Sequence, residues 1–232
     1  MVNKILKLTL IVGFALGLLT KPIMAMTAKL GIGLYGTTMN LNTDGSETET
    51  TGDKEVSSTK VDKTVGFASV FTEVMFKSDS GFGTAINFEY IPGSFELGNK
   101  SRLDTATAAG TGSDGAGTRI AKAKVSGIAT LSLEPTFYVN DMWGIFLKAG
   151  VNRLKVTTQE TLQASTYGNK DILGGVIGLG VRRDAPNGLF LKVEATMTNY
   201  DEMTFNGAGG NSNTVKADLD TEALRFAIGY AF

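Results

Sequence analysis

Cysteine and histidine are both absent from the 232 residues of this chain. Without cysteine, no disulfide can hold the fold and no thiol chemistry is available. Without histidine, histidine-based zinc sites and serine–histidine or aspartate–histidine catalytic pairs cannot form. We therefore expect no catalytic residue, no metal site and no bound cofactor, and the sequence argues against an enzyme.

Long apolar runs are also scarce. The main one, Leu8 to Leu19, has twelve residues. As a helix it would span only about 18 Å, whereas the hydrocarbon core of a membrane is about 30 Å thick. It follows two lysines and precedes a small residue at Ala25, which is the order of a secretory signal. We predict a cleavable signal peptide over residues 1–25 and one domain over residues 26–232.

The last nine residues show the clearest pattern in the chain. Alternate positions carry only large apolar side chains, namely Leu224, Phe226, Ile228, Tyr230 and Phe232. The residues between them are small or charged. A strand places alternate side chains on opposite faces, so one face of this segment is entirely apolar. Such a face suits lipid contact in a transmembrane barrel, with a terminal aromatic residue at the interface. The five residues are predicted to form the barrel-assembly signal.

The same alternation recurs along the chain and predicts eight strands. Their expected ranges are 29–38, 64–76, 82–91, 121–139, 145–157, 173–183, 189–200 and 224–232. Four longer loops are expected, at Asn40–Asp62, Pro92–Thr118, Thr158–Asp171 and Asp201–Asp220, with short turns at Ser78–Gly81, Asn140–Met142 and Asp184–Gly188. Loops and turns alternate strictly, which is typical of outer-membrane barrels with turns in the periplasm and loops outside.

These features predict an all-β fold, an eight-stranded antiparallel up-and-down transmembrane β-barrel. The rival fold is a soluble lipocalin-like barrel, which keeps apolar residues inside and charges outside. Here the face that carries Leu, Ile, Val and Phe has almost no charge, and the charged residues share the opposite face with small residues. This distribution favours lipid as the surrounding solvent.

Segments in the second half of the chain carry a family resemblance. They are residues 178–183 (GLGVRR), 184–188, 190–194 (FLKVE), 198–201 and the ending 229–232. Together they resemble the small eight-stranded outer-membrane β-barrel proteins of the OmpA-barrel, OmpX and opacity-protein superfamily. The resemblance implies integral location in the Gram-negative outer membrane, with outer-membrane lipids and the barrel-assembly machinery as partners. Because the chain ends at the barrel, no periplasmic peptidoglycan-binding domain is expected.

Strand parity predicts which charges point into the lumen. Seven bases and four acids are expected there: Lys29, Glu73, Glu89, Lys122, Lys124, Glu134, Lys148, Arg182, Lys192, Glu194 and Arg225. A barrel of eight strands is only wide enough to be filled by side chains or to hold one small ligand. The charges therefore form either an ion-pair network that fills the lumen, or a narrow porin-like channel whose basic excess favours small anionic solutes.

The loops are the other candidate site. Asn40–Asp62 and Asp201–Asp220 are net acidic, and Pro92–Thr118 is rich in Gly, Ser and Thr. They form either a solvated exterior or a contact surface for extracellular partners such as other cells, matrix or phage. Calcium bridging of the acidic loops is not favoured, because no twelve-residue ligand pattern appears. Nucleic acid is not expected as a partner, because these loops are acidic. The sequence favours a structural or surface-interaction role, with the porin-like channel as the alternative.

Overall fold

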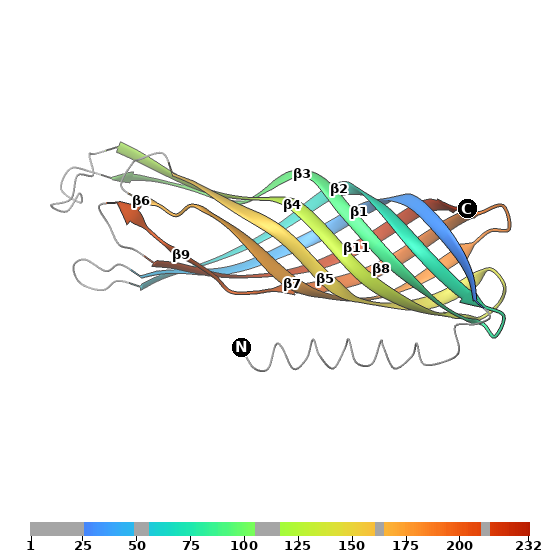
Figure 1. The fold of residues 1–232 in the computed structure, drawn as a ribbon. Helices are drawn as coiled ribbons and strands as arrows, with labels where there is room; N and C mark the ends of the chain where they lie inside the picture. Colours follow the sequence, from blue (N-terminus) through green and yellow to red (C-terminus); the bar gives the residue numbers. More distant parts are fainter. Residues whose placement is uncertain (1–25, 49–55, 105–116, 161–164, 210–213) are drawn as a thin grey trace.

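The computed structural model describes residues 26–48, 56–104, 117–160, 165–209 and 214–232 (Figure 1). The predicted signal peptide, residues 1–25, lies outside the described residues. None of the described residues forms a helix long and apolar enough to cross a membrane.

Eight long strands make up almost the whole of the described chain. They are β1 (Met26–Thr48), β2 (Val56–Ser78), β3 (Phe82–Asp104), β4 (Gly117–Tyr138), β5 (Trp143–Glu160), β7 (Asn169–Asp184), β8 (Leu189–Tyr200) and β11 (Thr214–Ala231). Three short strands complete the set: β6 (Ser165–Thr166), β9 (Met203–Asn206) and β10 (Ala208–Gly209).

Each long strand pairs antiparallel with the next one along the chain, and the sheet closes where β1 pairs with β11. The closing ladder runs from Gly31–Ala231 to Thr48–Thr214. Tight turns at residues 79–81, 140–142 and 185–188 join strands at one end of the barrel, where the C-terminus also lies (Figure 1). The predicted eight-stranded antiparallel up-and-down barrel is confirmed.

Large apolar side chains cover the outer face of the half of the barrel nearest the turns. We call this surface the apolar band. Each long strand contributes one exposed apolar residue to the edge of the band that lies away from the turns. These edge residues are Leu34, Val70, Tyr90, Leu131, Val151, Leu173, Met197 and Leu224. The period of two places the alternate residues in the lumen, where they are buried. Along β8, for example, burial alternates without interruption from Leu189 to Tyr200.

The loops are much shorter than the sequence predicts. Strands continue through most of Asn40–Asp62, Pro92–Thr118, Thr158–Asp171 and Asp201–Asp220, and only residues 49–55, 105–116, 161–164 and 210–213 within those ranges lie outside the description. We call the strand segments beyond the apolar band the crown. In the crown the pattern inverts: Met39 and Leu41 are buried inside, whereas Asn40 faces out. Polar outward residues made these segments resemble loops.

The wall of the barrel divides in the crown. The ladder between β2 and β3 runs only from Lys77–Gly83 to Val70–Tyr90, and that between β7 and β8 ends at Gly174–Tyr200. By contrast, β1–β2 and β3–β4 stay paired to Thr48–Val56 and Asp104–Gly117. The crown therefore consists of a first lobe (β9, β11, β1, β2) and a second lobe (β3, β4, β5, β7). The two lobes separate between β2 and β3, and on the other side the short pairing of β10 with β6 joins them (Figure 1).

Candidate functional site

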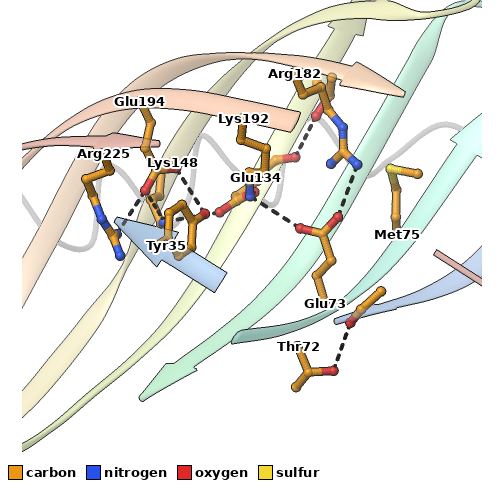
Figure 2. A network of polar contacts seen from close by, with 12 residues as sticks. Tyr35, Thr72, Glu73, Met75, Glu134, Lys148, Arg182, Lys192, Glu194 and Arg225 are labelled. Carbon is orange, nitrogen blue, oxygen red and sulfur yellow. Dashed lines mark hydrogen bonds and ion pairs between the residues drawn. The ribbon is translucent and has the colours of Figure 1, made fainter. Parts of the chain in front are cut away.

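Eight charged side chains meet inside the barrel at the level of the apolar band. Four acids and four bases, each at most 7% exposed, come from seven of the long strands: Glu73, Glu89, Glu134, Lys148, Arg182, Lys192, Glu194 and Arg225. Strand β1 adds Tyr35, which is 1% exposed. We call these nine residues the lumen plug. The eight of them that Figure 2 labels point toward one another across the barrel, and Glu89 pairs with Arg225.

The ion pairs form one alternating chain that begins near the turns. Arg182 Nη2 lies 2.9 Å from Asp184 Oδ1 and 3.1 Å from Glu73 Oε1. Glu73 Oε2 then accepts a hydrogen bond from Lys192 Nζ at 3.3 Å. Lys192 also donates to Glu134. Each base in this half thus lies between two carboxylates, which reduces the cost of its burial.

The chain continues from Glu134 toward the crown. Lys148 Nζ lies 3.2 Å from Glu134 Oε1 and 2.8 Å from Glu194 Oε1. Arg225 Nη1 donates to the same oxygen of Glu194 at 2.9 Å, and its Nη2 pairs with Glu89. Figure 2 shows Glu194 between its two bases, with the Tyr35 hydroxyl 3.4 Å from its second oxygen. Nine residues of alternating charge therefore cross the lumen without a break from Asp184 to Glu89, and Tyr35 hydrogen-bonds to one of them, Glu194.

Aromatic side chains fill the space around the ion pairs. The rings of Tyr35 and Phe71 lie 4.6 Å apart, and Phe190 meets Phe71 edge-on at 6.0 Å. The Arg225 guanidinium lies 4.1 Å from the centre of the Tyr35 ring, and Lys192 Nζ lies 5.0 Å from that of Phe146. Sequence analysis did not select Phe146 or Phe190 as lumen residues. Their parity, shared with Lys148 and Lys192, was the signal that could have found them.

Three of the predicted lumen charges lie elsewhere. Lys29 is exposed near the turn end of β1, and Lys122 and Lys124 are half-buried. In β4 the register shifts between Ser126 and Ala129, around Gly127 with φ +60°. The bulge exchanges the two faces, so that Val125, expected outside, is 2% exposed in the lumen. Lys122 and Lys124 consequently face outward.

The charge balance in the lumen changes with this correction. Four bases face four acids in the lumen plug, in place of the seven bases and four acids that strand parity alone predicts. The anion preference of the porin-like alternative depended on that basic excess. The porin-like alternative therefore loses its main support.

The predicted barrel-assembly signal lies on the outer face. All five side chains are 46–66% exposed: Leu224, Phe226, Ile228, Tyr230 and Phe232. The rings of Tyr230 and Phe232 meet edge-on with centroids 5.2 Å apart. The closing strand thus presents a continuous apolar surface to lipid.

A second feature of the lumen is an apolar cavity inside the crown, directly above the lumen plug. The space between its lining residues, together with the open solvent at its mouth, amounts to about 610 Å³, and Glu89 and Arg225 lie at its floor. Its walls are largely apolar, with Met39, Leu154 and Leu219 among the lining residues.

Among the described residues, no cluster of three or more His, Cys, Asp and Glu could hold a metal ion.

Three comparisons with known proteins bear on this geometry. No family model matches the chain, and no curated protein matches it. Solved structures do match. AlkL, an outer membrane protein solved in lipid bilayers, has a TM-score of 0.53 and 15% identity, over 92% of this chain and 94% of its own. The outer membrane protein OprG from Pseudomonas aeruginosa has a TM-score of 0.51 and 17% identity, over 91% and 99%.

A protease is also among the matching structures. The outer membrane protease OmpT from Escherichia coli has a TM-score of 0.44 and 9% identity, over 91% of this chain and all of its own. At that level of similarity it gives no reason to assign proteolysis to this chain. AlkL and OprG support the fold alone.

The closed barrel, its apolar band and these likenesses define the class of the protein. It is an eight-stranded β-barrel of the outer membrane, with the fold shared by AlkL and OprG. The exposed apolar band is suited to contact with lipid, and the lumen is lined by side chains of mixed charge.

Proposed function

We propose that this barrel is a non-conducting outer-membrane protein with a structural or surface-interaction role. The observation that carries the proposal is the unbroken chain of ion pairs from Asp184 to Glu89. Moving a carboxylate or an ammonium group away from its two oppositely charged neighbours is unfavourable, because an unpaired buried ion costs several kcal/mol. The lumen plug therefore favours a closed barrel over a narrow porin-like channel.

Planar-bilayer recording of the full chain tests closure. The wild-type barrel should give no current steps. A charge-neutral variant in which Glu73, Glu134, Lys148 and Lys192 are all replaced by serine should conduct, because two acids and two bases leave together and water takes their space. Steps in the wild type with the same conductance as in this variant would overturn the proposal.

The crown is the part of the molecule that would meet extracellular partners, such as other cells or phage. Its strands hold outward polar side chains on a hydrogen-bonded frame, which presents a more ordered surface than long loops would. Thr43 pairs with Val61 and Asn42 with Asp62. Replacing residues 43–61 by Asn-Gly therefore shortens one hairpin without changing its register.

That variant tests the surface role directly. Cells carrying the shortened hairpin should lose phage adsorption or cell-to-cell adhesion, while the barrel remains heat-modifiable. Full retention of every surface phenotype would argue for a purely structural barrel. The C-terminal strand, with its exposed apolar face, is the segment that the barrel-assembly machinery would bind.

The apolar cavity supports a second candidate function, the capture of small apolar molecules from outside. Phe67 and Phe95 face one another across the gap between β2 and β3, with ring centroids 5.0 Å apart, and both line the cavity. Xenon binds in apolar cavities, and pressurised crystals should show it beside Leu154. Leu154→Trp should remove that density, whereas outward Lys155→Trp should not. Crystals without xenon in the cavity would count against capture.

A further inference from the structure

Basic side chains gather on the outer face of β4 and β5, just beyond the apolar band. Leu154 and Val156 are each 2% exposed in the lumen, so their neighbours Arg153 and Lys155 point outward. Across the ladder, Ala129 pairs with Arg153 and Ser126 with Lys155. The bulge places Lys122 and Lys124 on this same outer face. We call these four bases the basic patch.

The level of the basic patch relative to the membrane follows from the strands. Val151 is the last apolar residue of the band on β5 and is 45% exposed. Arg153 follows two residues later, about 6.6 Å along the strand and, at a tilt of about 40°, about 5 Å further from the membrane centre. Lys155 lies about 10 Å out, within reach of a flexible side chain that bends back. Lys124 and Lys122 pair with Thr157 and Gln159 and lie about 15 Å and about 20 Å out, so Arg153 and Lys155 are the two bases of the patch nearest the headgroups. The headgroup layer on each side is about 5–7 Å thick.

The four bases of the basic patch have two acids as neighbours and keep an excess of positive charge: Asp171 lies opposite Lys155 across the β5–β7 ladder, and Glu96 lies opposite Lys124 across the β3–β4 ladder. Arg153 makes an exposed ion pair with Asp171 at 3.2 Å, with both side chains more than half exposed. Such pairs are weak, about 0–1 kcal/mol. Within the part of the chain that the structure describes, Lys122, Lys124 and Lys155 make no ion pair. A clustered set of bases is therefore open to an anion from the membrane side.

The opposite side of the crown carries the other sign of charge. Beyond Leu224, the next three outward residues of β11 are the acids Glu222, Asp220 and Asp218, followed by Lys216, and all four are exposed. In the same lobe, Asp44 of β1 forms an ion pair with Lys60 of β2 at 3.3 Å. The first lobe is thus acidic where the second lobe is basic. An anionic lipid headgroup would be repelled by the first lobe and attracted to the basic patch.

From this placement we propose that the basic patch binds the phosphate groups of outer-leaflet lipids, so that one side of the barrel holds a phosphorylated lipid against β4 and β5. The acyl chains would lie along the apolar band beside Leu131, Val151 and Leu173, which are 45–55% exposed. A basic cluster next to a membrane-spanning segment is a recognised arrangement for binding anionic headgroups.

The experiment uses the full chain refolded in neutral detergent, with bis-phosphorylated lipid A as the probe and native mass spectrometry as the readout. Each base at the surface contributes about 1 kcal/mol, or about five-fold in affinity. Arg153→Gln with Lys155→Gln should therefore weaken binding on the order of 25-fold. The charge-matched control, Lys60→Gln with Lys216→Gln on the first lobe, should change it less than two-fold. Asp171→Asn should tighten binding, because it frees Arg153.

Several results would overturn the proposal. Equal weakening in the matched control would show a general charge effect and no local site. Undiminished binding of dephosphorylated lipid A would show that the acyl chains alone bind. Competition by free inorganic pyrophosphate at the same concentration as lipid A would identify a soluble phosphate as the ligand. Retained heat-modifiability in each variant verifies that the barrel has folded.

Discussion

Removing Glu194 tests whether the lumen plug carries stability. Its Oε1 lies 2.8 Å from Lys148 and 2.9 Å from Arg225, and its side chain is fully buried. In Glu194→Ala both bases lose one carboxylate. Each keeps another, because Lys148 still pairs with Glu134 at 3.2 Å and Arg225 with Glu89.

The remaining partners set the size of the effect. Breaking a buried ion pair costs about 3–5 kcal/mol of folding free energy when it leaves a buried charge without a partner. Since each base keeps a second carboxylate, we expect a loss of stability at the lower end of this range, about 3 kcal/mol. With a urea dependence of about 2 kcal/mol per molar, the unfolding midpoint should fall by about 1.5 M. The chain has one tryptophan, Trp143, which is 42% exposed on the outer face, so its fluorescence reports unfolding from detergent micelles.

The control is Glu222→Ala, which removes an exposed, outward carboxylate in the crown and should leave the midpoint unchanged. The double variant Glu194→Ala with Lys148→Met should cost less than the sum of the two single variants, because it removes an opposite pair together. The reasoning would be refuted if Glu194→Ala unfolded at the wild-type midpoint while passing an anion current. That result would mean that water, and not protein charge, solvates Lys148 and Arg225.

Three further predictions concern the barrel wall, its orientation and its assembly. Gly33→Ala should destabilise the barrel by about 1–3 kcal/mol in urea titrations, because a Cβ there would lie 2.5 Å from a backbone oxygen and a phenylalanine ring. Gly36→Ala, with open space around it, should not destabilise it. A cysteine at Ser46 should react with an impermeant thiol reagent on intact cells, whereas one at Asn187 should not; labelling at Asn187 alone would invert the topology. Replacing Phe232 by a polar residue should lower the yield of heat-modifiable barrel in the outer membrane, and an unchanged yield would contradict its role in assembly.

Local alternation was enough to predict the membrane-spanning half. The face of β8 follows from Leu189, Lys192 and Glu194 without any knowledge of neighbours, because a strand in lipid must keep large apolar groups outside and charges inside. The crown was predicted less well. There the outer face is polar and apolar residues such as Met39 lie inside, so the membrane pattern disappears and the alternation predicts loops in place of strands.

The candidate sites depended on features that alternation does not contain. The bulge at Gly127 exchanged the faces of β4 and moved Lys122 and Lys124 out of the lumen. A bulge is fixed by the pairing of two strands, and one extra residue is invisible in the sequence of either strand alone.

The sequence by itself determined the all-β barrel, its solvent and the parity of most strands, because these follow from the period of one strand in lipid. Only the tertiary structure decided which charges meet. Glu73 and Lys192 lie 119 positions apart, yet they bond across the lumen because closure brings β2 and β8 face to face. It also decided where the wall divides, since the ladder between β2 and β3 ends at Val70–Tyr90 while each strand continues. Ion pairing and ladder length depend on positions in space, and these exist only once the barrel has closed.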